Sequence, residues 1–521
     1  MRSRKIMLLA AFALAVFAWP GLSLARSANK PPQVTPMMQA TGGVADSQVL
    51  PRDENDKAAA HVTGLCYPLS GAVEARLCDR GAPMQGLDWA KAGQATEGKW
   101  MADLANLPTG GPYDLEVRLL DAKGQPLAQT AVREILVGDL WILAGQSNMQ
   151  GVGKVSQLPP PIAPVHMFSM DDRWQLGREP LHALLESRDE AHWKPFVQKG
   201  KTIEEIRPGW SVAARSPKAQ SVGPGLPFAW ELYRLSGVPI ALIPCALGGT
   251  SLEQWSPAKK GEGGKSLYGA MLRRAAAAGG RIRGVVWYQG ESDTGSAETA
   301  GTYLDRFVDF VAAVRSDLGN ADLCFLYVQL GRFIVASPTE PNWDTVREAQ
   351  RLAEPKLGRA AVVPAVDCPM VDIIHLDTAG QMKVGRRLAL EAAREVFGQK
   401  LLRGPRLAEV KVASPGLLAV CFTDVNGRLR AEGRPFGFSF DTAKEPGKPA
   451  TDPAGKPLPI IVRVDLSQDK PDTVQVHFWD KLPEGARLWY GRGFDPSANL
   501  TDEQDMGVLA FGPVAIPLSG G

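Results

Sequence analysis

Two short segments, far apart in the sequence, carry the side chains that acyl-transfer chemistry needs. The first is Gly145–Met149, which follows an apolar run over 134–144 that is typical of a buried strand. A serine at the end of a strand, here Ser147, suits a nucleophile, because the turn lifts its hydroxyl out of the sheet while the strand holds it still. The second segment is Asp372–His375, which supplies a base and a carboxylate that can orient it.

Only one of the six histidines has a setting that suits a catalytic base. A serine hydroxyl is inert at neutral pH without a base, and the unperturbed pKa of histidine fits that task. His375 has a carboxylate, Asp372, three residues before it and a helix start just after it. We therefore expect Ser147, His375 and Asp372 to be nucleophile, base and acid. The alternative is that His375 is a surface histidine that caps a helix.

The elements that must position these residues alternate between strands and helices from about residue 137 to residue 399. The sequence predicts strands over 136–144, 239–244, 284–288, 323–329 and 361–366, and helices over 226–236, 266–278, 303–318, 344–352 and 379–397. This alternation predicts an α/β fold in which helices cover both faces of a parallel sheet. In such a sheet, ligands bind outside the carboxyl ends of the strands.

Residues that follow the predicted strands can stabilise the oxyanion of acyl transfer. The tetrahedral intermediate carries a negative oxygen, and each preorganised donor aimed at it is worth about 10² to 10³ in rate. We expect three donors: the backbone N–H of Ser147, an N–H from Gly248 or Gly249, and the side-chain amide of Gln289. Taken alone, the glycine pair would indicate an ordinary turn.

Four polar residues beside these candidates are expected to support the site or to contact substrate. They are Gln146, Asn148, Glu291 and Asp293. Glu291 has three alternatives: it could orient His375 in place of Asp372, bind substrate hydroxyls, or support its loop by hydrogen bonds. We favour support.

Four motif blocks follow one another along the chain: Gly145–Met149, Gly248–Thr250, Trp287–Asp293 and Asp372–His375. In residues and order they resemble the motif blocks of the SGNH-type carbohydrate acetylesterases. The α/β-hydrolase elbow is excluded, because its Gly-x-Ser-x-Gly motif needs glycine where this chain has Met149. The likeness is strongest to the sialate O-acetylesterase family, which is related to acetylxylan esterases, and it covers about residues 95–400.

The resemblance implies a flavodoxin-like three-layer sandwich and removal of acetyl groups from sugar hydroxyls. The resemblance implies that Ser147, Asp372 and His375 form the catalytic triad. It also implies that Gln289 has the oxyanion role that an asparagine fills in other SGNH enzymes. It implies an acetylated carbohydrate as substrate and neither a metal nor an organic cofactor.

The sugar itself is left open by the sequence. A sialic acid carboxylate would need a convergent arginine, for which Arg207, Arg215 and Arg332 are candidates. Acetylated xylan or another polysaccharide is the alternative substrate. An alternative of another class is an inactive carbohydrate-binding surface protein, against which the intact serine, aspartate and histidine argue.

Length and composition indicate a globular protein of two or three domains. The net charge of +2, without basic runs after the amino terminus, argues against a nucleic-acid partner. Residues 1–25 are typical of a secretory signal, which predicts a secreted or periplasmic protein, with an uncleaved anchor as the alternative. No later stretch is apolar enough for stable membrane insertion. We expect a linker over 26–50, a small β-sandwich-like module over 51–136, the catalytic domain over 137–400 and a second β module over 401–521.

The six cysteines are scattered and form neither a CxxC pair nor a Cys/His cluster of the kind zinc needs. Cys66 and Cys78 could bridge within one hairpin.

The proline-rich stretch 151–222 carries Trp174, Trp193 and Trp210, whose faces could stack on sugar rings. The alternative is that this insertion packs only on itself.

Overall fold

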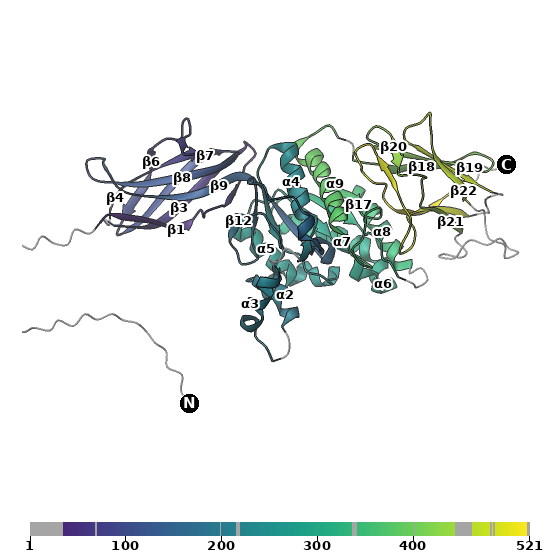
Figure 1. Cartoon of the computed structure of the whole chain (residues 1–521), viewed down its shortest axis with the longest axis horizontal. Coiled ribbons are helices and arrows are strands. Elements are labelled where there is room, and N and C mark those ends of the chain that lie inside the picture. The colour runs from purple at the N-terminus through teal and green to yellow at the C-terminus, as the bar shows by residue number, and fades with distance from the viewer. Residues whose placement is uncertain are drawn as a thin grey trace, which may run out of the picture.

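A computed structural model shows three regions in a row along the long axis of the molecule (Figure 1). They are an amino-terminal β region (37–136), a central α/β region (137–397) and a carboxyl-terminal β region (406–515), and each is built around its own apolar core. The cores support the expected division into domains, whose boundaries stay a prediction. The structure describes residues 35–67, 70–197, 200–214, 219–335, 341–401, 403–442, 461–479, 482 and 485–517.

A parallel sheet of six strands forms the middle of the central region. Its strands, in spatial order, are β11 (Val165–Phe168), β14 (Ile240–Pro244), β9 (Pro126–Gly145), β15 (Gly284–Tyr288), β16 (Cys324–Gln329) and β17 (Ala360–Pro364). All residues of β14, β15, β16 and β17 are buried, which explains their unbroken apolar sequences. The five strands expected here are confirmed, and β11 is a sixth that lies within the insertion.

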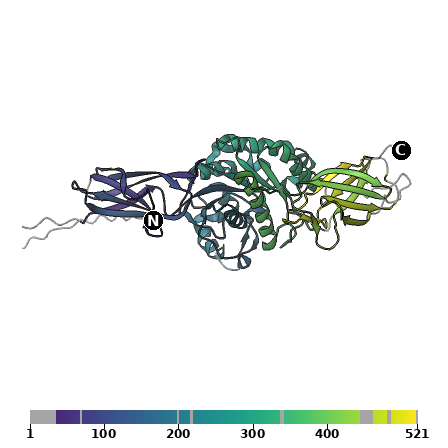
Figure 2. The same cartoon turned by 90° about the horizontal axis from the view of Figure 1, so that it is seen from above.

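Helices cover both faces of this sheet (Figure 2). On one face of the sheet α4 packs against α9. The helices α5, α7 and α8 lie on the other face. The long helices are α4 (Gly225–Ser236), α5 (Leu267–Ala277), α7 (Tyr303–Asp317), α8 (Pro341–Ala353) and α9 (Thr378–Phe397), and all five were expected. The sequence did not predict the remaining elements of the region, which are α1 (Ser147–Gln150), α2 (Glu190–Trp193), α3 (Ile203–Ala214), α6 (Ala297–Gly301), β10 (Gly153–Lys154), β12 (Trp174–Leu176) and β13 (Gln220–Val222).

The amino-terminal region is a mainly antiparallel sheet that continues into the central one. Its strands are β1 (Met37–Gly43), β2 (Val49–Pro51), β3 (Lys57–Tyr67), β4 (Gly71–Asp79), β5 (Ala82–Pro83), β6 (Ala90–Thr96), β7 (Lys99–Pro108) and β8 (Gly110–Leu120). The long strand β9 pairs with β8 in one sheet and with β14 and β15 in the other, so the boundary expected at 136/137 falls inside one strand.

One expectation for the amino-terminal region needs correction, and one possibility that the sequence left open is not realised. The expected linker over 26–50 contains β1 and part of β2, because β1 pairs with β3 and buries Met38 in the core. Cys66 and Cys78 are both buried and do not form a disulfide bond. They do not share a hairpin, because β3 and β4 do not pair with each other. The expected signal segment, 1–25, lies outside the described residues. Within the described residues, no helix is long and apolar enough to cross a membrane.

The described residues of the carboxyl-terminal region form three small antiparallel sheets. Its strands are β18 (Arg406–Ser414), β19 (Leu417–Thr423), β20 (Leu429–Ala431), β21 (Phe438–Thr442), β22 (Ile461–Leu466), β23 (Thr473–Phe478), β24 (Ala486–Tyr490), β25 (Leu500–Asp502) and β26 (Phe511–Ala515).

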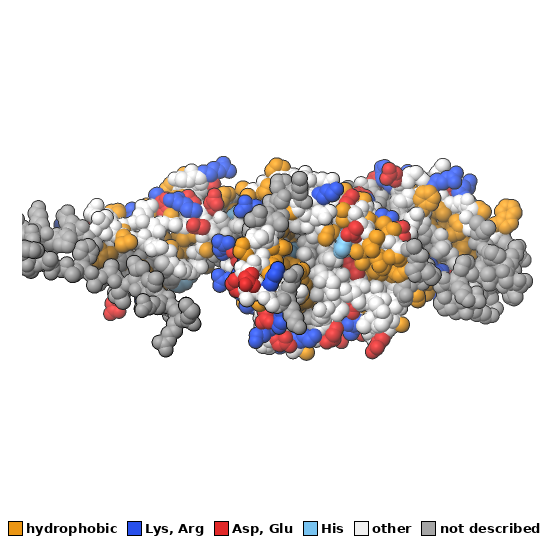
Figure 3. Space-filling model, turned by 60° about the horizontal axis from the view of Figure 1, so that its bottom comes forward, with side chains coloured by type: hydrophobic (Ala, Val, Ile, Leu, Met, Phe, Trp, Pro, Cys, Tyr) orange, Lys and Arg blue, Asp and Glu red, His pale blue; other side chains and the backbone are white. Residues whose placement is uncertain are grey.

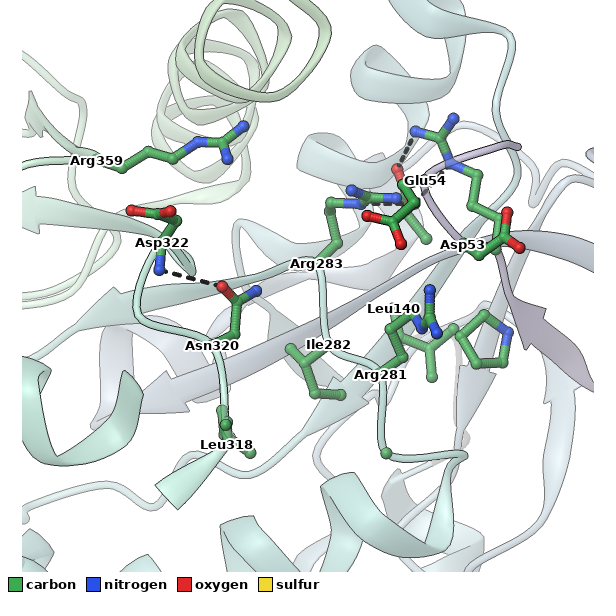
Figure 4. Close-up of a pocket in the computed structure, with 16 residues that line it drawn as sticks. Asp53, Glu54, Leu140, Arg281, Ile282, Arg283, Leu318, Asn320, Asp322 and Arg359 are labelled. Atoms are coloured by element: carbon green, nitrogen blue, oxygen red, sulfur yellow. Dashed lines mark hydrogen bonds and ion pairs between the residues drawn. The ribbon is translucent and has the colours of Figure 1, made fainter. Parts of the chain in front are cut away.

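A cavity of about 420 Å³ lies where the amino-terminal region meets the central sheet (Figure 4). Beside it the buried carboxylate of Asp139 accepts hydrogen bonds from Arg52, at 2.8 and 2.9 Å, and from Arg283, at 2.9 Å. Asp139 lies near the start of the parallel part of β9, whereas Ser147 follows its end. The cavity and Ser147 therefore lie at opposite edges of the sheet.

Candidate active site

Ser147 begins the short helix α1 directly after the central strand β9. The turn between them needs glycine at position 145, where φ is 129° and a Cβ atom would lie 2.2 Å from the carbonyl oxygen of Tyr288. The Gln146 N–H donates to that same carbonyl at 2.8 Å. The neighbouring strand β15 thus fixes the path of the chain just before the serine.

Ser147, His375 and Asp372 form a continuous hydrogen-bonded chain. His375 Nε2 lies 2.9 Å from Ser147 Oγ, and His375 Nδ1 lies 2.7 Å from Asp372 Oδ2. The other carboxylate oxygen, Oδ1, accepts the backbone N–H groups of Ile374 and His375 at 2.9 and 2.8 Å. Partial burial raises the pKa of Asp372, but the hydrogen bonds from Ile374 and His375 outweigh it and hold that pKa below its usual value. The carboxyl is therefore ionised at neutral pH.

Asn148 joins the serine helix to the histidine loop. Its Nδ2 donates to the carbonyl of Ile374 at 3.2 Å, and its Oδ1 accepts the N–H of Leu376 at 3.1 Å. The same Nδ2 donates to Glu291 Oε1 at 2.8 Å. The residues on both sides of His375 are thus held by the neighbour of Ser147.

Glu291 is buried and acts on Asn148, while Asp372 occupies the position on His375 Nδ1. Burial raises the pKa of Glu291 above its ordinary value. Its second oxygen, Oε2, has no hydrogen-bond partner among the described residues. Of the three alternatives for Glu291, this geometry fits support of the loop.

The glycine pair lies beside the serine. A Cβ atom on Gly248 would lie 3.3 Å from the Cβ of Ser147, whereas one on Gly249 would meet no atom within 4 Å. The Gly248 N–H donates to Gln150 Oε1 at 2.9 Å, so a neutral oxygen already occupies this donor. Sequence reasoning missed Gln150, because its partner lies 98 residues away and nothing local marks it.

Gln289 has different partners from those we expected. Its side chain is fully buried, and Nε2 donates to Asp293 Oδ2 at 2.7 Å and to the Thr250 carbonyl at 3.1 Å. These contacts use both N–H groups of the amide. In this conformation Gln289 ties together the loops after β14 and β15 and has no amide hydrogen left for an oxyanion.

Asp293 and Gln146 are buried in the same network. Asp293 accepts the N–H of Leu252 at 2.8 Å and pairs with Arg306 at 2.8 Å. Gln146 Oε1 accepts the N–H of Ser292 at 3.3 Å. With exposed fractions of 0% and 3%, neither residue is open to substrate, and both are loop supports.

The arginines considered for a substrate carboxylate are engaged elsewhere or lie outside the described part. Arg332 pairs with Asp495 at 3.0 Å, and Arg207 Nε donates to the Leu185 carbonyl at 2.6 Å. Arg215 lies outside the described residues. Trp174 and Trp210 of the insertion pack against the central core. Across the described residues, no group of three His, Cys, Asp or Glu side chains is arranged to hold a metal ion.

Known proteins resemble this chain over the same region. A family model for carbohydrate esterases, the sialic acid-specific acetylesterases, matches residues 137–394. A probable carbohydrate esterase of Arabidopsis thaliana is 31% identical over 275 residues, which cover 48% of this chain and 88% of the plant protein. The chain belongs to this family of carbohydrate esterases.

Two further comparisons extend the likeness. Mouse sialate O-acetylesterase is 24% identical over 397 residues, which cover 62% of this chain and 68% of the mouse protein. The crystal structure of a carbohydrate acetylesterase from Xanthomonas citri matches with a TM-score of 0.59 and 23% identity, over 91% of this chain and 99% of that one. The match to the Xanthomonas citri structure shows a shared fold across all three regions. As a member of this carbohydrate esterase family, the chain is an esterase.

Proposed function

We propose that the protein is a secreted serine esterase that removes O-acetyl groups from a carbohydrate, with a sialate O-acetylesterase-like activity as first candidate. The observation that carries the proposal is the chain of contacts from Ser147 Oγ through His375 to Asp372, at 2.9 and 2.7 Å. The proposal includes an SGNH-type, flavodoxin-like catalytic domain. The sheet with helices on both faces and the order of the motif blocks support that assignment.

In the proposed mechanism His375 Nε2 takes the proton of Ser147 Oγ as that oxygen attacks the acetyl carbonyl. Asp372 holds the Nδ1–H and stabilises the imidazolium that forms. The same proton then passes to the sugar oxygen, so the alcohol leaves and an acetyl-serine remains. Water repeats the sequence and releases acetate.

The oxyanion would lie against the start of α1. The Ser147 N–H is available there, because the first N–H groups of a helix have no intrahelical acceptor. The Gly248 N–H is the second proposed donor, and the substrate oxygen would replace Gln150 Oε1 on it. Gln289, whose amide is engaged, is proposed as a support for this arrangement.

A neutral acetylated polysaccharide such as acetylxylan is the second candidate substrate. The observation in its favour is that Arg332 already pairs with Asp495 and donates to the Cys368 carbonyl at 3.3 Å. A sialic acid carboxylate would have to compete with these partners. The predicted signal over 1–25 supports action outside the cytoplasm.

Acetate release from O-acetylated sialic acids and from acetylated xylo-oligosaccharides tests the proposal. We expect hydrolysis of one class, and a loss of about 10⁶ in turnover for Ser147→Ala, which removes the nucleophile but little buried volume. Near-normal turnover in that variant would exclude Ser147 as nucleophile. A wild-type protein that binds these sugars but releases no acetate would favour the carbohydrate-binding alternative.

A further inference from the structure

The loop that carries Asp372 and His375 connects β17 to α9 at the surface of the molecule. The side chain of Asp372 is 49% exposed, so burial alone does not fix it. A misplacement of about 1 Å in a catalytic group can cost about 10² in rate. The neighbours that hold this loop from outside therefore matter for the proposed reaction.

One set of contacts links the loop to the carboxyl-terminal β region through Arg332. The guanidinium of Arg332 pairs with Asp495 at 3.0 Å and donates to the carbonyl of Cys368, inside the loop, at 3.3 Å. Two backbone hydrogen bonds run beside it. Phe333 N donates to the Phe494 carbonyl at 2.8 Å, and Ile334 N donates to the Ile373 carbonyl at 2.6 Å. Residues 332–334 thus lie between the carboxyl-terminal region and the residue that follows Asp372.

A second set of contacts holds the start of the loop. Asp367 binds both terminal nitrogens of the fully buried Arg387 at 2.7 Å and lies 2.9 Å from Lys383 Nζ. Arg387 Nε donates to the carbonyl of Asp505 at 2.8 Å, and Lys383 pairs with the Asp505 carboxylate at 3.1 Å. Asp505 belongs to the turn between β25 and β26. Both contacts therefore come from the carboxyl-terminal region.

The segment that presents Asp495 is itself anchored in the central region. Arg347 is fully buried and donates to the carbonyls of Gly491 and Gly493 at 3.0 and 2.5 Å. The carboxylate of Asp344 accepts the Gly493 N–H at 2.8 and 3.0 Å. Arg347 and Asp344 thus fix the backbone at Gly493, two residues before Asp495.

From these contacts we propose that the carboxyl-terminal β region positions the acid–base loop, with Asp495 and Asp505 as its positioning residues. The inference rests on the proposed roles of Asp372 and His375. Asp495 keeps Arg332 on the Cys368 carbonyl. Asp505 holds Lys383 through its carboxylate and Arg387 through its backbone carbonyl, and both of these side chains bind Asp367. Neither residue touches the reacting atoms.

Steady-state kinetics of the full-length Asp495→Ala variant test this inference. Without the ion pair, Arg332 releases the loop, and we expect kcat to fall about 10-fold while KM stays within twofold. Arg430→Ala is the matched control, because it breaks an exposed 2.8 Å pair with Glu503 inside the same region. The control should keep wild-type kcat. The inference would be overturned if Asp495→Ala kept kcat as well as the control does, or if it raised KM without lowering kcat.

Asp505→Asn is the second variant, and it keeps the positioning test open if Asp495→Ala does not fold. Position 505 has φ of 57°, which asparagine tolerates better than alanine, so the substitution removes charge without adding backbone strain. The variant loses the pair with Lys383 but keeps the carbonyl that accepts from Arg387, so we expect a smaller fall in kcat than for Asp495→Ala, at nearly constant KM. Wild-type kcat in this variant would remove Asp505 from the positioning set.

A double-mutant cycle separates positioning from general destabilisation. If Asp495 acts through the acid–base loop, Asp495→Ala should cost less than twofold in an Asp372→Asn background, because the contact that it aligns is already impaired. A further 10-fold loss in that background would show independent effects and contradict the inference. Ser147→Ala, assayed in parallel on p-nitrophenyl acetate, keeps the two failures distinct: residual activity there contradicts the proposed function itself.

Discussion

Asp372 and His375 are separated by only two residues, so one loop supplies both the proposed base and the group proposed to orient it. The backbone N–H groups of Ile374 and His375 fold the carboxylate of Asp372 back onto the loop, which leaves Oδ2 for the imidazole. Ser147 comes from a different connection and meets His375 only through the fold. This division explains why the sequence could indicate the pair by local spacing and the serine by its place after a strand.

We predict that Asp372→Asn lowers kcat by about 10⁴, since an amide supports neither the correct tautomer of His375 nor its cation. Glu291→Gln should cost less than about tenfold, because Gln can still accept the hydrogen bond from Asn148. Turnover of the two purified variants, both checked for folding by circular dichroism, decides the ranking. A larger loss in Glu291→Gln would move the orienting role to Glu291.

Gln289→Ala should lower the melting temperature more clearly than it lowers kcat. The substitution removes one donor from the buried Asp293 carboxylate, which keeps Leu252 and Arg306, and the donor that Gln289 gives to the Thr250 carbonyl. A buried group that loses its hydrogen-bond partner costs about 1–3 kcal/mol. Tm, kcat and KM measured together test this. If kcat fell by about 10² to 10³ with unchanged KM and Tm, the oxyanion role first expected for Gln289 would be restored.

At the scale of elements, the sequence predicted the central sheet and its long helices closely. Buried parallel strands are continuous apolar runs, and the amphipathic helices between them have a clear period, so both patterns are local. The misses have a common cause. Strand β1, the sixth parallel strand β11 and the continuity of β9 across two sheets depend on pairing with distant partners, which no local pattern encodes.

The insertion between α1 and α4 contains a buried carboxyl that should make stability depend on pH. Burial raises the pKa of Glu179 to about 8, and its Oε1 lacks a partner among the described residues. Between pH 4.5, the ordinary pKa, and pH 8 the unfolded chain has released this proton while the folded chain keeps it. The contribution of Glu179 to the free energy of unfolding is therefore highest below pH 4.5 and falls as the pH rises to about 8.

Glu179→Gln removes that titration. We predict that the melting temperature of the variant minus that of the wild type grows by a few degrees from pH 5 to pH 9. Thermal melts at both pH values provide the measurement. Glu190→Gln is the control: this carboxylate in the same insertion is half-buried and pairs with Lys194, which lowers its pKa, so it stays ionised from pH 5 to pH 9. Its difference from wild type should show no such rise. A constant difference for Glu179→Gln would mean that Glu179 titrates alike in the folded and unfolded chains.

At the scale of the whole molecule, buried polar contacts join the three regions. Figure 3 shows acidic and basic side chains interspersed over the central part of one face, in keeping with a net charge of +2. The amino-terminal region is joined by the unbroken strand β9 and by Arg52 on Asp139. The carboxyl-terminal region supplies backbone partners to Arg347, Arg387 and Gln329, three side chains buried in the central region.

These contacts predict that the central region does not fold without the carboxyl-terminal one. A chain that ends at residue 403 would leave Arg347 and Arg387 without carbonyl partners from 491–493 and 505, and buried charges that lose partners cost several kcal/mol. This cost is a large part of the free energy of unfolding of a typical domain, which is about 5–15 kcal/mol. We expect the shortened chain to be insoluble or to lack near-ultraviolet circular dichroism. A chain ending at residue 517 should keep the wild-type melting temperature, and a soluble, active chain ending at 403 would contradict both this prediction and the positioning role of the carboxyl-terminal region.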